Sequence, residues 1–282
     1  MKYAKKIFTS VCMAIILFGA ASASANDFDS SGRKPTFGHG EKLTYSVSYR
    51  AAMWPNTDVG NVVLTVSDDQ LDGVDSYRLD AVATISGMFK WFYKLNDRYH
   101  IWLRKSDMRP LRADANLSEG DYRFTSTYIY DWNNRVSHNT YHNHAHPKAS
   151  QSTVQLVSDA MDAISLFYNL RLNDFSSYVP GESRSLAFLL TDKVQLIKYR
   201  YHGREVKKIL GLGEVATLKF SCQLVNDSAD SFEDGSEFFV WISDDANRIP
   251  VLFESPLKVG SIRARLVKYE GLVAPEMPSR RR

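Results

Sequence analysis

The chain has 282 residues, with 35 Lys and Arg against 32 Asp and Glu, and only two cysteines. This length is sufficient for a substantial hydrophobic core without covalent cross-links, so a disulfide-stapled miniprotein is excluded. A net charge of +3 is far from the basic surplus that displaces counterions from nucleic-acid phosphates.

The first 25 residues are typical of a cleavable export signal. Three lysines within residues 2–6 precede the apolar run Ile7–Ala20, and small residues at 23–25 suit a signal peptidase. The apolar run is shorter than the roughly 20 residues that a membrane-spanning helix needs. We therefore expect residues 1–25 to be removed, the mature chain to lack a transmembrane segment, and the protein to be periplasmic.

Removal of this signal would change the composition of the chain. Three lysines and no acidic residue would be lost, which leaves 32 basic residues against 32 acidic ones and no electrostatic argument for binding nucleic acid. Cys12 would also be lost, so Cys222 would have no internal disulfide partner. The alternating sequence around Cys222 favours a small buried side chain over a reactive thiol.

Most of the remaining chain alternates apolar and polar residues with a period of two, as half-buried strands do. Turn sequences such as Asp72-Gly73 separate these segments. Short strands at this spacing predict an antiparallel sheet, and hence an all-β fold with minor α content. The predicted strands are 42–49, 59–67, 77–85, 98–104, 122–131, 185–190, 194–202, 207–212, 217–225, 237–242, 251–255 and 261–269.

A single helix is predicted between the two series of strands. Ser158-Asp159 offers a cap, and apolar residues from Met161 to Leu172 then fall at helical spacing. We expect this helix to pack as a plug or lid at the end of a curved sheet.

Two segments show the same order of features. Residues 99–111 and 238–251 each contain an aromatic strand with a Trp, an acidic turn, then Arg, Pro and a second strand. One interpretation is two related half-sheets that each present a Trp-bearing hairpin, Trp102 in one and Trp241 in the other. The alternative is two similar hairpins that arose independently.

Several motifs together resemble the exported bacterial family catalogued as domain of unknown function 3108. They are FGHGEKLTYSV at 37–47, SGMF at 86–89 leading to DRY at 97–99, DAISLFY at 162–168, and WISD to RIPV over 241–251. The resemblance spans nearly all of 37–270, although the 136–153 region matches no family pattern. It implies a Gram-negative envelope protein with a curved or half-open β-barrel similar to lipoprotein-carrier folds. It implies no activity and no functional residues.

On this basis the chain divides into four parts. Residues 26–36 are expected to be a flexible mature N-terminus after the signal at 1–25. A single β-rich domain then covers 37–271, and residues 272–282 form a disordered basic tail.

A histidine run is the first candidate site. On an extended segment His142, His144 and His146 would share one face, so neutral imidazoles could converge on Zn, Cu or Ni. With His138 they would form a metal-binding cluster or the centre of a metal-dependent hydrolase. The competing interpretation is a polar loop, because Asn and Pro surround the run and no carboxylate is near in sequence.

An aromatic run is the second candidate site. Rings interleaved with lysines would suit the rim of an apolar pocket or a lipid-contacting patch, although a core or corner position is the alternative. A neighbouring acid and arginine would form a structural ion pair or turn contact, or alternatively a ligand anchor. The candidate ligand-binding residues are Met88, Phe89, Trp91, Phe92, Tyr93, Asp97, Arg98, Trp102 and Trp241.

Motifs that specify a reaction, such as a nucleophile elbow or a phosphate-cradling glycine loop, are not found in the sequence. We therefore expect a non-enzymatic binding or carrier protein of the envelope without a cofactor. Its ligand would be apolar or amphipathic, a lipid or lipoprotein. The alternatives are the metal site above, and a scaffold that recruits envelope proteins through an exposed strand edge.

Overall fold

The computed structural model describes residues 34–51, 54–91, 93–225, 237–256 and 260–274. The predicted signal at 1–25, most of the predicted flexible N-terminus and most of the predicted basic tail lie outside these residues. Within the described part, no helix has both the length and the apolar character needed to cross a bilayer.

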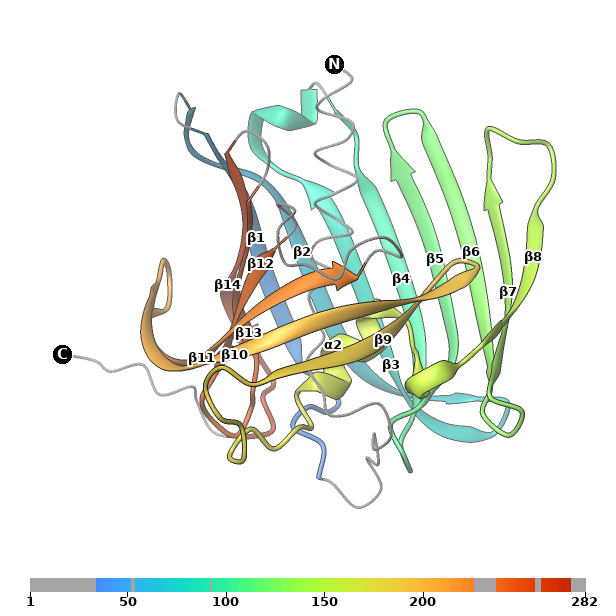
Figure 1. The fold of residues 1–282 in the computed structure, drawn as a ribbon. Helices are drawn as coiled ribbons and strands as arrows, with labels where there is room; N and C mark the ends of the chain where they lie inside the picture. The colour runs from blue at the N-terminus through green and yellow to red at the C-terminus, as the bar shows by residue number, and fades with distance from the viewer. Residues whose placement is uncertain (1–33, 52–53, 92, 226–236, 257–259, 275–282) are drawn as a thin grey trace.

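The described residues form one antiparallel sheet of fourteen strands, strongly curved and not closed into a complete barrel (Figure 1). The predicted fold class is therefore confirmed. The strands are β1 (Lys42–Ala51), β2 (Trp54–Leu71), β3 (Val74–Ile85), β4 (Asn96–Arg104), β5 (Pro110–Glu119), β6 (Tyr122–Asp131), β7 (Val136–Asn143), β8 (Ser150–Gln155), β9 (Ser183–Leu190), β10 (Lys193–Ile209), β11 (Gly213–Val225), β12 (Phe238–Ser243), β13 (Pro250–Pro256) and β14 (Ser261–Glu270).

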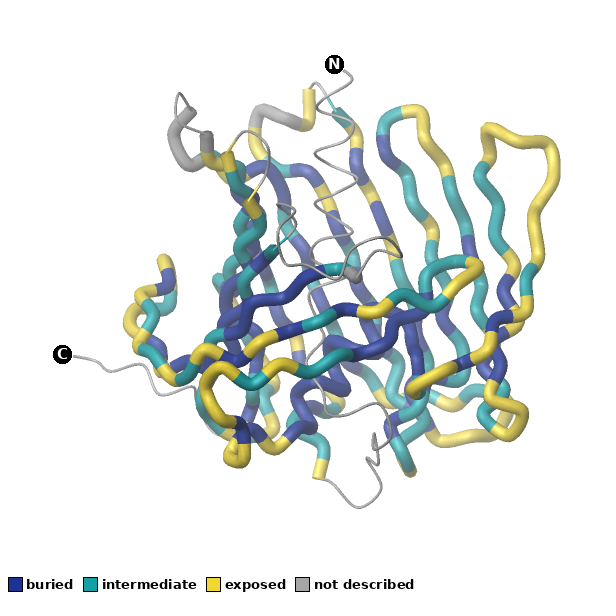
Figure 2. The backbone as a smooth tube through the Cα atoms, in the orientation of Figure 1, coloured by how far each residue is buried: buried dark blue, intermediate teal, exposed yellow. Residues whose placement is uncertain are grey.

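The strand order is β8-β7-β6-β5-β4-β3-β2-β1-β14-β13-β12-β11-β10-β9, so the first and last strands pair at the middle of the sheet. Alternation places one set of side chains inside the curve, as Leu79, Ala81 and Ala83 of β3 show by their burial. Figure 2 shows buried positions concentrated in the central strands, whereas β7 and β8 are mostly exposed or intermediate. The core therefore lies within the concave side of the sheet.

Local sequence accounts for the sharp turns. Asp72 and Gly73 both have positive φ, at 50° and 79°, between the paired residues Leu71 and Val74. A two-residue loop with two left-handed residues is the hairpin turn that matches strand twist, and Asp-Gly favours it.

The helix differs from its prediction at both ends. Helix α2 runs only over Ala163–Leu170, and its cap is Asp162, whose carboxylate accepts a hydrogen bond from the Ser165 amide. The predicted cap residues Ser158 and Asp159 instead lie in a 3-10 turn, η2 (Val157–Asp159), and both have positive φ. All eight residues of α2 are buried, and the helix lies inside the curve of the sheet as a plug (Figure 1).

The structure differs from the predicted strand list in three places. The predicted strands 194–202 and 207–212 belong largely to one strand, β10, whose register shifts at Gly203. The polar hairpin of β7 and β8 was not predicted, because segments such as SQSTVQ carry little apolar alternation. Strand β5 was expected only as the second strand of the Trp102 hairpin.

The two similar hairpins occupy equivalent places in the fold. Each has a register shift immediately after its Trp, so that Leu103 pairs with Pro110 and Ile242 pairs with Pro250. Trp102 faces Arg78 of β3 across the ladder, and Trp241 faces Lys219 of β11.

The environments of the two Trp side chains agree as well. The Trp102 indole nitrogen donates to Asp69 of β2 at 2.9 Å, and that of Trp241 donates to Glu205 of β10 at 2.5 Å. Cationic side chains lie over both rings. Strands β1–β6 and β9–β14 therefore share the same order of long hairpin, Trp hairpin and final strand, which favours two related half-sheets.

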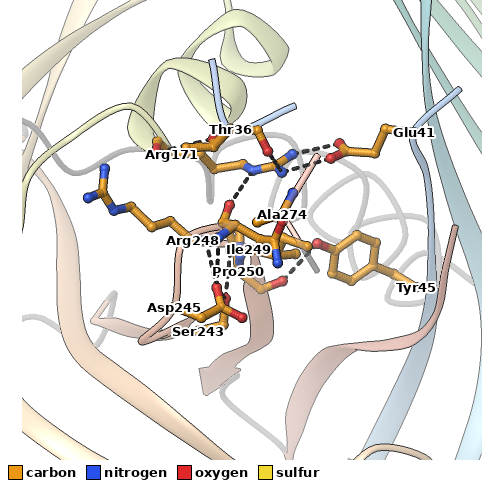
Figure 3. Close-up of polar contacts among 11 residues, drawn as sticks. Thr36, Glu41, Tyr45, Arg171, Ser243, Asp245, Arg248, Ile249, Pro250 and Ala274 are labelled. Atoms are coloured by element: carbon orange, nitrogen blue, oxygen red, sulfur yellow. Dashed lines mark hydrogen bonds and ion pairs between the residues drawn. The ribbon is translucent and has the colours of Figure 1, made fainter. Parts of the chain in front are cut away.

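A buried polar cluster ties the plug helix to both halves of the sheet (Figure 3). The fully buried Arg171 guanidinium donates to both carboxylate oxygens of Glu41, at 2.6 and 2.8 Å. It also donates to the backbone oxygens of Thr36 and Asn247, at 2.9 and 3.0 Å. Burial is the largest single effect and lowers the pKa of this guanidinium, but the charge and hydrogen bonds of Glu41, with the nearby Tyr168 and Tyr45, together outweigh it and the pKa is raised. Arg171 is therefore charged and satisfied in the core.

Candidate functional site

A cavity of ≈240 Å³ lies on the concave side, between the wall formed by β4–β6, the start of α2 and the end of β9. The lining is dominated by apolar and aromatic side chains, as is typical of small-molecule pockets. The lining residues are Tyr99, Ile101, Ala113, Asp114, Ala115, Leu117, Glu119, Tyr122, Phe124, Ser126, Tyr128, Asp162, Ala163, Ile164, Phe188, Leu189, Leu190 and Thr191.

The hollow follows from the residue sizes on the wall. Strand β5 turns Ala113 and Ala115 toward the inside, between the larger rings and side chains of β4 and β6. Because β5 is the middle strand of the three, its small side chains leave a space that the aromatic side chains of β4 and β6 line but do not fill. Along the same wall the rings of Tyr122 and Phe124 stack at 6.3 Å between centroids.

The β9–β10 hairpin crosses the open side of the sheet like a strap (Figure 1). At its tip the Thr191 amide donates to the Tyr128 hydroxyl at 2.8 Å, and the Asn139 side-chain amide donates to the Thr191 oxygen at 2.6 Å. The Leu189 amide donates to the Met161 oxygen at 2.9 Å. These bonds hold Phe188 to Thr191 over the cavity.

At the α2 end of the cavity, Asp162 is fixed by several donors. Its carboxylate accepts from the Ser165 amide at 2.9 Å, the Ser165 hydroxyl at 2.6 Å and the Tyr130 hydroxyl at 3.1 Å. Burial outweighs these bonds and raises the pKa of the Asp162 carboxyl above its usual value of 3.8. The Asp162 side chain is therefore held in place at this end of the cavity.

The raised pKa of Asp162 predicts a specific pH dependence of stability. Between the unfolded and the folded pKa the native state binds more protons, so stability decreases as pH rises through that window. Asp162→Asn keeps a capping side chain and removes the titration. We expect its free energy of unfolding, relative to wild type, to increase across the window and then level off. Urea unfolding at a series of pH values measures this; parallel curves for the two proteins would contradict it.

The residues of the candidate aromatic run whose side chains are described do not line the cavity. Trp91, in the 3-10 helix η1 (Gly87–Trp91), is 89% exposed, so the core interpretation does not hold for it. Tyr93 is partly buried against the core, close to Gly120. The side chains of Met88, Phe89 and Phe92 lie outside the described part of the chain.

The other candidate ligand residues do not line the cavity either. Asp97 is fully buried and accepts the Ser118 amide at 2.9 Å, whereas Arg98 is exposed on the other face of β4. They do not form the predicted ion pair, since successive residues of a strand point to opposite faces. Trp102 and Trp241 lie on the outer face of the sheet, capped by cationic side chains.

The histidines do not converge as predicted. Strand β7 ends at Asn143, so His144 and His146 belong to the following turn instead of an extended face. The rings of His142 and His144 lie 4.1 Å apart, while the His142 Nε2 contacts the His146 backbone oxygen at 2.9 Å. Among the described residues, no group of three or more His, Cys, Asp or Glu is placed to hold a metal ion.

One other sequence interpretation concerns a buried group. Cys222 is buried, as the alternation around it predicted, and burial raises the pKa of its thiol far above the usual value.

The cavity was not predicted from the sequence, because its wall and strap lie about seventy residues apart in the chain. The only local signal was the small pair Ala113 and Ala115 at inward positions of a strand.

These features define a half-open β-barrel protein with an apolar cavity on its concave side. The chain belongs to the family described as Protein of unknown function (DUF3108), which matches it over residues 44–267. Its fold is similar to that in the crystal structure of a beta-barrel-like protein of domain of unknown function DUF1849 from Brucella abortus. The TM-score is 0.55 at 10% identity, covering 83% of this chain and 98% of the other. A comparison with curated proteins found no match.

Proposed function

We propose that this protein is a non-enzymatic binding or carrier protein of the bacterial envelope, exported to the periplasm, and that the concave cavity holds an apolar or amphipathic ligand. The observation that carries the proposal is the cavity itself. A packed interior would have no unfilled space beside aromatic rings, since protein cores approach crystal density. Here Ala113 and Ala115 leave a hollow of ≈240 Å³.

The shape of the cavity supports a slender ligand. Its wall extends along β5 from Ala113 to Glu119, seven residues of strand, or about 20 Å. Its volume is slightly below the roughly 300–1,000 Å³ of pockets for drug-sized molecules. A long, narrow, apolar space of this kind suits a hydrocarbon chain that enters beneath the strap.

The rest of the chain supports transport or storage better than catalysis. The Asp162 carboxylate and the Tyr128 hydroxyl, both in the lining, are already bonded to Ser165 of the first helical turn and to the strap. The sequence of residues 1–25 supports export. An apolar ligand would need such a carrier to cross the aqueous periplasm.

A dye-binding experiment tests the proposal. The purified mature protein, stripped of lipid, is titrated with N-phenylnaphthylamine, a neutral dye whose fluorescence rises in apolar surroundings. We expect saturable binding at one site, displaced by long-chain alcohols and not by short ones. Dye fluorescence that does not saturate, or that no alcohol displaces, would contradict a defined cavity. Cell fractionation tests the location: release by osmotic shock supports export, and retention in the cytosol contradicts it.

A further inference from the structure

We propose that one end of the sheet is a membrane-docking surface, which contacts a bilayer containing anionic lipids through an exposed indole and a group of basic side chains. This surface, the basic rim, consists of Lys90, Trp91, Lys94, Arg123 and Lys148. None of these five residues lines the cavity, so the basic rim goes beyond the proposed function.

The basic rim is formed by three turns that lie at the same end of the sheet. They join β3 to β4, β5 to β6 and β7 to β8, and in an antiparallel sheet such alternate turns emerge at one end (Figure 1). Backbone hydrogen bonds link them. The Gly120 amide donates to the Lys94 oxygen at 2.7 Å, and the His144 amide donates to the Arg123 oxygen at 2.9 Å. The three turns therefore form one continuous surface.

Trp91 is the most exposed large apolar side chain among the described residues. It is 89% exposed, followed by Leu210 at 73%. Tyr122, which begins β6 beside the same turns, adds a second ring that is 38% exposed. Trp and Tyr are the side chains enriched at membrane–water interfaces, because their rings combine an apolar body with a polar group. An exposed indole at the tip of a turn is placed to enter such an interface.

Positive charge surrounds this indole. All four basic residues of the rim are exposed, and within the described part of the chain none of them forms an ion pair. The Arg123 guanidinium donates instead to the backbone oxygens of Gly120 and Tyr122, at 2.7 and 2.9 Å. The three turns carry one exposed acid, Asp121. Because the expected mature chain has 32 basic and 32 acidic residues, this excess is a local feature of the rim.

An anionic bilayer matches both features of the basic rim. Lysine and arginine side chains meet lipid phosphates at the membrane surface, and each one strengthens binding about fivefold. An aromatic ring beside them is buried at the boundary between head groups and acyl chains. The two contributions act together, since Lys90 and Lys94 lie on either side of Trp91 in the chain.

The test is co-sedimentation of the purified mature protein with two kinds of vesicle. One contains phosphatidylglycerol and phosphatidylethanolamine in equal parts, and the other contains phosphatidylcholine alone. We expect binding to the anionic vesicles to be at least about tenfold tighter, and high salt to remove most of this difference.

Variants then locate the contact on the rim. Trp91→Ser should weaken binding to the anionic vesicles at least about fivefold, because the indole no longer enters the interface. Lys90→Gln combined with Lys94→Gln should weaken it at least about tenfold and reduce its salt dependence. Ile129→Ser is the matched control: Ile129 is 51% exposed, but it lies near the other end of β6. We expect wild-type vesicle binding for this variant.

Two results would overturn the docking surface. One is a wild-type protein that sediments with neither vesicle, which leaves a protein partner as the alternative occupant, or equally with both. The other is unchanged binding by both rim variants, which would place the contact elsewhere. Dye titration separates this proposal from the cavity. Dye binding without vesicle binding contradicts docking alone, whereas vesicle binding without dye binding contradicts the proposed function alone.

Discussion

Arg171→Leu is expected to reduce the free energy of unfolding by roughly 3–5 kcal/mol, because the substitution leaves Glu41 as a buried charge without its partner. Both side chains are fully shielded from solvent, so water cannot replace the lost bonds. The backbone oxygens of Thr36 and Asn247 would lose a donor as well. The measurement is chemical unfolding, followed by circular dichroism.

Two variants control this prediction. Glu41→Leu combined with Arg171→Leu should recover part of the loss, because removing both charges is less costly than removing one. Lys268→Ala removes an exposed ion pair with Glu270 at 2.6 Å and should leave the unfolding midpoint unchanged. A wild-type midpoint for Arg171→Leu would show that the buried pair does not stabilise the plug.

Ala115→Trp is expected to abolish ligand binding while the protein remains folded. The indole would occupy the hollow between β4 and β6, and we expect dye affinity to fall at least about a hundredfold, or about 2.8 kcal/mol. Fluorescence titration measures the affinity, and circular dichroism measures the fold.

Asn116→Trp is the matched control on the same strand. Asn116 is exposed on the outer face, so the same indole would lie one residue away and outside the cavity. We expect wild-type affinity for this variant. If both variants bind dye equally well, the ligand site is not the concave cavity.

The general architecture could be predicted from sequence because strand alternation is a local signal. Segments such as Tyr77–Ile85 alternate clearly, since one face meets the core and the other meets water. The β7–β8 hairpin escaped prediction for the opposite reason: it lies at the sheet edge, where neither face is fully buried. Long-range packing also determined where helix α2 begins: it starts one residue after Asp162 and not near Ser158.

The candidate sites also show how far local sequence signals can predict structure. Aromatic residues such as Trp91 and Trp102 are conspicuous in sequence, yet one is exposed and the other lies on the outer face. The cavity depends instead on two alanines opposite a strap about seventy residues further along the chain. Two small residues in a strand are only a weak local signal, and the wall and strap come together only in the fold.

The central claim is that the concave cavity holds an apolar ligand in the periplasm. Native mass spectrometry of the untagged protein, recovered by osmotic shock from the cells that make it, tests the claim most directly. We predict an added mass on wild type and on Asn116→Trp that organic extraction removes and identifies as an amphiphile, and no such mass on Ala115→Trp. An unliganded wild-type protein, or the same mass on all three, would contradict the account.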